Sequence, residues 1–255
     1  MLHHRGAAGL RSANKIPVSP DGLAILENLE KVAAERQRRE ADAGLEASTL
    51  AVKAYQHSRF ARTYADLLSQ PRYAESARFF LDELYGPQDF SDRDTQFARV
   101  VPGLVRLFPQ ELVGTVKALS ELHALSEEMD SAMGAATGSN SLDARQYASA
   151  WQTVGRPQVR ARQIELMLQV GSALDRYTRN PILRHSLRLM RAPARAAGLP
   201  ALQRFLEAGF DTFRAMKGAD AFLQTIAERE RDLAALLFAV DLASPRAARE
   251  LSALP

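Results

Sequence analysis

The 255-residue sequence contains no cysteine. This absence excludes disulfide bonds, thiolate zinc sites, iron–sulfur clusters and cysteine nucleophiles. It also removes the disulfide framework that is typical of small secreted domains. We therefore expect neither an oxidised extracellular scaffold nor a thiol-based catalytic centre.

Long apolar segments are also missing. No apolar run approaches the roughly 20 residues that a membrane-spanning helix needs. The first residues, Met1 to Lys15, include basic side chains but no apolar core of a secretory signal. The sequence therefore predicts a disordered leader over residues 1–19, no membrane association and a cytoplasmic location.

The common catalytic motifs are absent as well. The sequence has no Gly-rich phosphate loop, no dinucleotide-binding glycine motif and no nucleophile elbow. Di-iron helical bundles use Glu-x-x-His pairs, whereas Glu121 and His123 are two residues apart and point to different sides of a helix. We predict no metal site. No motif in the sequence supports an enzyme that uses Asp, Glu, Arg and Tyr side chains. The sequence therefore favours a non-catalytic protein.

The sequence does contain ample apolar and helix-forming residues. Hydrophobic residues make up 46% and charged residues 25%, which is enough for a sizeable core. The segment 109–132 carries Leu112, Val116, Leu119, Leu122, Leu125 and Met129 at helical spacing. Strand signals are nearly absent. These patterns predict an all-α fold, either a compact multi-helix bundle or a globin-like helical array of about nine to ten helices. We expect one domain over residues 20–240 and a weakly ordered tail over residues 241–255.

Prolines and capping residues mark the expected helix boundaries. Pro71, Pro157, Pro181 and Pro200 each stand where the first turn of a helix tolerates proline. Ser91-x-x-Asp94 is a variant of the capping box and predicts a short helix that ends before Pro102. Pro193 is expected to interrupt the helix that begins at Pro181.

Of the five histidines, His123 is placed most favourably for a function. It lies on the strongly periodic segment, at the edge of the apolar face. One interpretation is a haem axial ligand or a pH-sensitive group. The simpler interpretation, which we favour, is a hydrogen-bonded histidine at the boundary of the core. Likewise Phe205, Phe210, Phe213 and Phe222 are most simply core residues, but could line a pocket for an apolar ligand.

The densest local feature is the sequence FFLDELYGP over residues 79–87, followed by DFSDRD over residues 89–94. The functional interpretation is a ligand pocket or partner site built around Tyr85, Asp89 and Arg93. The structural interpretation is a helix end whose aromatic side chains fix the turn, with Arg93 paired to a carboxylate. We favour the structural interpretation.

A basic tract covers residues 156–195, which hold nine arginines against two acidic residues. Within it Arg184, Arg188, Arg191 and Arg195 recur at the spacing of one helical face. This face could bind an anionic ligand or an acidic partner. It could also be a salt-bridged surface against the acidic remainder of the chain, which we favour. Nucleic acid is not expected, because Tyr177 is the only aromatic residue in the tract.

The FFLDELYGP and DFSDRD segments resemble a family of uncharacterised proteobacterial all-helical proteins with an FFLxxLYGP motif. The segment from Arg191 to Glu230 is also similar to that family, so the resemblance covers about residues 50 to 238. It implies the all-helical fold and a bacterial origin. It implies no catalytic residue.

Together these observations favour a non-catalytic binding or interaction protein. Its partner surface is expected at the FFLDELYGP turn, at the Arg184–Arg195 face, or at both. The partner could be another protein or a second copy of the chain. The alternative hypothesis is a sensor that holds a ligand or haem in the helical core through His123; otherwise no cofactor is predicted.

Overall fold

The computed structural model describes residues 19–83 and 90–255, and across these ranges every regular element is a helix. The all-α prediction is therefore confirmed. Of the thirteen helices in these ranges, ten have at least seven residues, and the others are α3, α10 and α13. The bounds are α1 (Pro20–Glu40), α2 (Ala43–Thr63), α3 (Ala65–Ser69), α4 (Ala74–Glu83), α5 (Ser91–Leu107), α6 (Gln110–Thr137), α7 (Ala144–Val154), α8 (Pro157–Thr178), α9 (Pro181–Leu189), α10 (Arg191–Ala196), α11 (Pro200–Ala215), α12 (Asp220–Ala239) and α13 (Ala247–Glu250).

Local chemistry explains where many of these helices begin. Proline occupies the first turn of α1, α8, α9 and α11. Backbone N–H groups in the first turn have no acceptor within the helix, so the missing N–H of proline costs no hydrogen bond there. At α7, the side chain of Asp143 accepts a hydrogen bond from Gln146 N, while the side-chain oxygen of Gln146 accepts one from Asp143 N. The helix starts predicted at Pro157, Pro181 and Pro200 are therefore confirmed.

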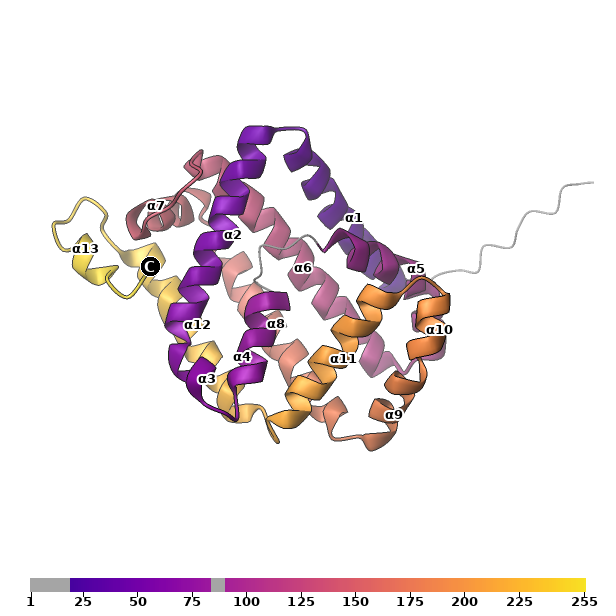
Figure 1. Cartoon of the computed structure of the whole chain (residues 1–255). Helices are drawn as coiled ribbons and strands as arrows, with labels where there is room; N and C mark the ends of the chain where they lie inside the picture. Colours follow the sequence, from indigo (N-terminus) through magenta and orange to yellow (C-terminus); the bar gives the residue numbers. More distant parts are fainter. Residues whose placement is uncertain (1–18, 84–89) are drawn as a thin grey trace, which may run out of the picture.

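The long helix α6 runs diagonally through the middle of the arrangement in Figure 1. It packs against α1, α2, α7 and α8, and α8 packs in turn against α11 and α12. Helices α9 and α10 lie at one edge of the molecule, and α13 lies at the opposite edge. The position of α6 makes it the element from which side chains can reach several neighbouring helices.

Phenylalanines form much of the largest apolar cluster. Phe213 and Phe222 are fully buried, Phe210 is buried, and Phe205 is partly buried against Phe79. A second cluster surrounds Trp151 and the end of α12. The prediction that the phenylalanines are core residues is confirmed.

Three boundary predictions were wrong. The helix expected to begin at Pro71 begins at Ala74, after a turn. Helix α5 continues through Pro102 to Leu107, and its N-cap residue is Phe90 without a side-chain cap, so Ser91 is inside the helix. The interruption expected at Pro193 occurs instead at Met190, and Pro193 lies within the first turn of α10, where proline is tolerated.

The last fifteen residues pack against the rest of the molecule. Ala247, Leu251 and Leu254 are buried in the cluster around Trp151, and the guanidinium of Arg62 donates to the Leu254 carbonyl oxygen at 2.7 Å. The apolar residues of this segment therefore find a partner surface on other helices. In the part of the chain that the structure describes, no helix has the length and apolar character needed to cross a membrane.

Candidate functional site

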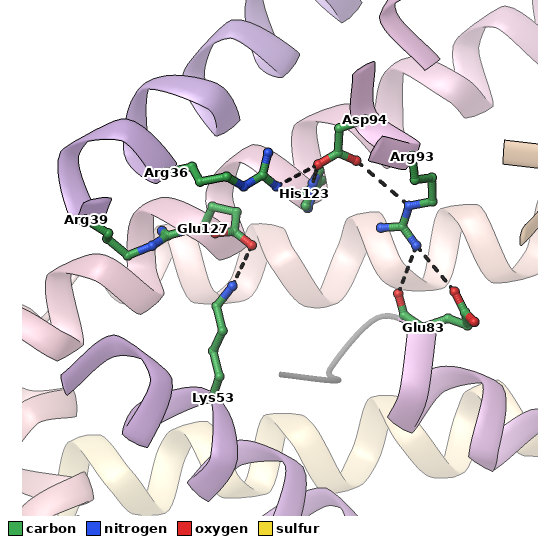
Figure 2. A network of polar contacts seen from close by, with 8 residues as sticks. All are labelled: Arg36, Arg39, Lys53, Glu83, Arg93, Asp94, His123 and Glu127. Atoms are coloured by element: carbon green, nitrogen blue, oxygen red, sulfur yellow. Dashed lines mark hydrogen bonds and ion pairs between the residues drawn. The ribbon is translucent and has the colours of Figure 1, made fainter. Parts of the chain in front are cut away.

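The polar network around Asp94 connects two residues that the sequence singled out separately (Figure 2). Asp94 lies in the first turn of α5, and its Oδ2 accepts a hydrogen bond from Arg36 Nη2 at 3.0 Å. His123 Nε2, from α6, lies 2.9 Å from the same oxygen. Arg93 Nε lies 3.8 Å from Oδ1. Asp94 is therefore the shared counter-charge of groups from α1, α5 and α6.

Arg93 is held on all sides. Its guanidinium carbon lies 4.0 Å from the ring centroid of Phe90 and 4.5 Å from that of Phe205. Its Nη1 donates to the carbonyl oxygen of Glu83 at 3.3 Å, at the end of α4, and lies 3.5 Å from the Glu83 carboxylate. Burial lowers the pKa of Arg93, although arginine remains protonated in proteins. The predicted pairing of Arg93 with a carboxylate is therefore present, and the packing of its guanidinium between two aromatic rings is a further feature that the sequence did not predict.

One turn beyond His123 on α6, Glu127 forms a second centre of charge. Its Oε2 accepts from Arg39 Nη2 at 2.5 Å and its Oε1 accepts from Lys53 Nζ at 2.7 Å. Arg39 also donates to Ser131 Oγ at 2.8 Å. The side chains of Glu127 and Arg39 are both buried. This carboxylate therefore joins α1 and α2 to α6, as Figure 2 shows.

Two carboxyl groups in the network share one electrostatic pattern. Burial alone would raise the pKa of Asp94, but the hydrogen bonds with His123 and Arg36 and the electrostatic effects of His123 and Arg93 outweigh burial and lower the pKa below its ordinary value. Burial would likewise raise the pKa of Glu127, but Lys53 and Arg39 lower it. Both groups are therefore ionised at neutral pH and serve as fixed anions.

Asp130, the next inward-facing acid on α6, behaves oppositely. Its side chain is buried and accepts a hydrogen bond from Gln56 Nε2 at 2.9 Å. Burial raises the pKa of Asp130, and the nearby Glu127 charge adds to that increase. The interior of α6 thus combines acids that are held ionised with one that burial pushes toward its neutral form.

The geometry of the network indicates a structural role. Its carboxylates are already paired with cations from neighbouring helices. No residue of the network lines either of two surface pockets of the molecule. Coordination of a haem iron through His123 Nε2 would have to replace the contact with Asp94. Among the described residues, no group of three or more His, Asp or Glu side chains is arranged to hold a metal ion.

The predicted arginine face lies elsewhere, on α9 and α10. Arg184 Nε donates to Asp211 Oδ1 at 2.9 Å, and Arg188 lies 4.0 Å from the other oxygen of that carboxylate. Arg191 makes a bidentate pair with Glu207, with Nε and Nη2 each 2.6 Å from one carboxylate oxygen. Both acids belong to α11, so the arginine face is salt-bridged to that neighbouring helix.

The structure thus separates the predicted site residues. Arg93 and His123 meet at Asp94, whereas Arg184, Arg188 and Arg191 pair with acids of α11 and make no contact with Asp94. Tyr85 and Asp89 lie outside the described residues. Sequence reasoning missed Arg36, Arg39, Lys53 and Glu127 as network members. A signal did exist in α1, because Arg36 and Arg39 continue the helical spacing of the buried residues Ile25, Leu29 and Val32.

A family model matches residues 35–244, under the description "Domain of unknown function (DUF8198)". The match covers most of the chain and both the network and the arginine face. The chain belongs to the DUF8198 family. No curated protein and no solved structure matches it. The DUF8198 match agrees with the resemblance to an uncharacterised family, whereas the proteobacterial origin and the FFLxxLYGP motif of that family stay predictions.

Proposed function

We propose that this protein is a non-catalytic interaction protein that docks an acidic, amphipathic helix of a partner protein on α9. The observation that carries the proposal is the outer face of α9. None of the residues of α9 is buried, and Ile182, Leu189 and the adjoining Met190 are 72%, 64% and 51% exposed. Their spacing of seven and eight residues places them on one side of the helix.

The charge around this apolar strip favours an acidic partner. The segment between Asp175 and Glu207 contains seven arginines and no acidic residue. Asp211 and Glu207, which pair with Arg184, Arg188 and Arg191, come from α11 on the side facing the body of the molecule. Since a guanidinium has five N–H donors, each of these arginines can bind a second carboxylate.

An apolar strip with a cationic border is a common design of protein-binding surfaces. Exposed apolar groups that gather on one face mark interaction sites, and methionine and arginine are enriched at interfaces. An amphipathic helix binds such a surface through apolar residues spaced three or four apart. Acidic residues beside those positions would meet the arginines. A nucleic acid would use the arginines but would not cover the apolar strip.

The proposal is tested by the binding of a fluorescent synthetic helix with leucines on one face and glutamates elsewhere, followed by fluorescence anisotropy. We expect saturable binding to the wild-type protein. The double variant Ile182→Ser/Leu189→Ser should bind at least about tenfold more weakly, because two apolar contacts of about 1 kcal/mol each are lost.

Matched controls separate this site from general stickiness. The variant Leu23→Ser/Leu50→Ser removes two exposed leucines from α1 and α2 and should change the affinity less than about twofold. A peptide with lysines in place of the glutamates should not bind. The proposal is wrong if the wild-type protein does not bind the acidic peptide, or if both double variants weaken it equally. Self-association that is lost in Ile182→Ser/Leu189→Ser would instead assign the strip to a second copy of the chain.

The bacterial origin, the cytoplasmic location and the lack of catalysis stay predictions from the sequence. We propose the Arg184–Arg195 face as the partner surface. We assign the Arg93 side chain to internal packing, because Phe90, Phe205 and Glu83 already contact its guanidinium.

A further inference from the structure

A surface pocket lies at the corner where α8 and α11 end and α12 begins. Its volume is about 370 Å³, within the usual range for small-molecule pockets. Arg179, Arg214 and Lys217 line it, and the fully buried ring of Phe213 contributes to its wall. Three of its lining side chains are therefore cations.

The one carboxylate in the lining is already engaged. Asp175 is buried, and its Oδ1 accepts a hydrogen bond from the backbone N–H of Ala219 at 3.0 Å, just before the first turn of α12. Its other oxygen accepts from Arg179. Asp175 thus fixes the junction of α8 and α12 and balances the charge of Arg179. Neither carboxylate oxygen of Asp175 is therefore available to pair with Arg214 or Lys217.

Arg214 and Lys217 have no carboxylate partner within ion-pair distance in the described part of the chain. Both side chains are exposed, and they stand one turn apart at the end of α11. Lys217 has a φ of 55°, the left-handed conformation that residues other than glycine rarely adopt. A further guanidinium stands at the edge, since Arg72 Nη2 donates to the Gly218 carbonyl oxygen at 3.2 Å.

We infer that this pocket binds a small phosphate-bearing anion. The two uncompensated positive charges match the roughly two negative charges of a phosphate monoester or inorganic phosphate at neutral pH. The planar fork of an arginine suits paired phosphate oxygens, and a lysine adds a mobile point charge. The variants that test this pocket and the proposed docking strip on α9 share no residue, so either assignment can fail without the other.

The test is isothermal titration calorimetry of the full-length protein with inorganic phosphate and with pyrophosphate, at constant ionic strength. We expect saturable binding to the wild-type protein. The variant Arg214→Gln/Lys217→Gln should bind at least about tenfold more weakly, because two charge-assisted contacts are lost. The control variant Lys31→Gln/Arg231→Gln removes two exposed cations elsewhere and the same net charge, and should bind within about twofold of the wild type.

Three results would overturn the inference. The wild-type protein could show no saturable heat with either anion. The control variant could lose as much affinity as the pocket variant, which would indicate a general charge effect. A single-stranded oligonucleotide could bind through Arg214 and Lys217 while phosphate and pyrophosphate do not, which would indicate a polymer-binding surface instead of a small-molecule pocket. Circular dichroism of each variant confirms that the compared proteins are folded.

Discussion

At the scale of single residues, Glu127 is the acid on which the junction of α1, α2 and α6 depends. It is buried and pairs with both Arg39 and Lys53. The substitution Glu127→Gln leaves both cations without their counter-charge in a poorly solvated place. We expect the free energy of unfolding in urea to fall by about 3 kcal/mol, as it does when one partner of a buried ion pair is removed.

The adjacent residue supplies the control for that measurement. Glu128 pairs with Arg156, but both side chains are close to half exposed. Because water screens an exposed ion pair, Glu128→Gln should lower the free energy of unfolding by less than about 1 kcal/mol. If Glu127→Gln lowered the free energy of unfolding by as little as Glu128→Gln, the Glu127 network would not stabilise the fold.

Asp130 gives a prediction with the opposite sign. Burial raises the pKa of this carboxyl above that in the unfolded chain, so its contribution to stability is full below about pH 4 and is lost as the pH rises through the folded-state pKa. An asparagine at this position cannot ionise, and its carbonyl oxygen can still accept from Gln56. We therefore expect Asp130→Asn to increase the free energy of unfolding at pH 7, with a gain that disappears toward pH 4.

Urea denaturation between pH 4 and pH 8 measures this difference. Each unit by which the pKa is raised corresponds to about 1.4 kcal/mol of the gain. Asp232→Asn, at an exposed position on α12, is the matched control for replacing an aspartate by asparagine. A variant Asp130→Asn that is less stable than the wild type at pH 7 would mean that the ionised form of Asp130 is needed.

At the scale of elements, α2 and α6 approach each other closely at Gly134. A Cβ atom at this position would lie 2.4 Å from Thr49 Oγ1, 2.9 Å from Thr49 N and 3.0 Å from Thr49 Cα. The hydroxyl could rotate, but the backbone of α2 could not move without separating the helices. We expect Gly134→Ala to lower the free energy of unfolding by about 1–3 kcal/mol, because overpacking exceeds the gain in helix propensity.

Gly114 lies on the same helix and tests the opposite case. An added Cβ there meets no atom within 4 Å, so Gly114→Ala should raise the free energy of unfolding by about 0.5–1 kcal/mol through helix propensity alone. Thermal or urea denaturation of the two variants gives the comparison. A stabilising Gly134→Ala would contradict the close approach of α2 and α6.

The same scale shows what a single sequence can predict. Helical periodicity and proline positions predicted most helices, because these signals act within a few residues of the chain. They failed at Pro102, where the sequence predicted a break. The burial of Val101, and the packing of neighbouring apolar residues of α5 against the cluster that it forms with α1 and α6, outweigh the hydrogen bond that proline removes. Such tertiary packing overrides local preference and leaves no local signal.

At the scale of the whole molecule, the candidate site shows the same limit. The spacing of His123 on its helix correctly predicted a hydrogen-bonded position at the boundary of the core. Its partner Asp94 lies 29 residues away, and Arg36 lies 58 residues from Asp94. One sequence contains no signal for contacts over such separations. The sequence predicted that the arginine face is salt-bridged, but it did not identify Asp211 and Glu207 as the acids that pair with it.

The whole-molecule arrangement also explains why α9 is the proposed docking element. Helices α9 and α10 lie at the edge of the molecule, away from the central helix α6 (Figure 1). The apolar residues Ile182 and Leu189 remain exposed there, while the C-terminal apolar residues at the opposite edge are buried. Exposed apolar residues that the chain does not cover itself are available to a partner.

The most direct measurement is site-specific photocrosslinking in the native host, with a photoreactive amino acid placed at position 189 and, as a control, at position 50. Leu189 lies on the proposed strip, and Leu50 is an exposed leucine on α2. We predict an adduct from position 189 alone, whose crosslinked peptide is acidic with apolar residues at helical spacing. No adduct from position 189, the same adducts from both positions, or an adduct with a second copy of the chain would contradict the proposed docking of an acidic partner helix.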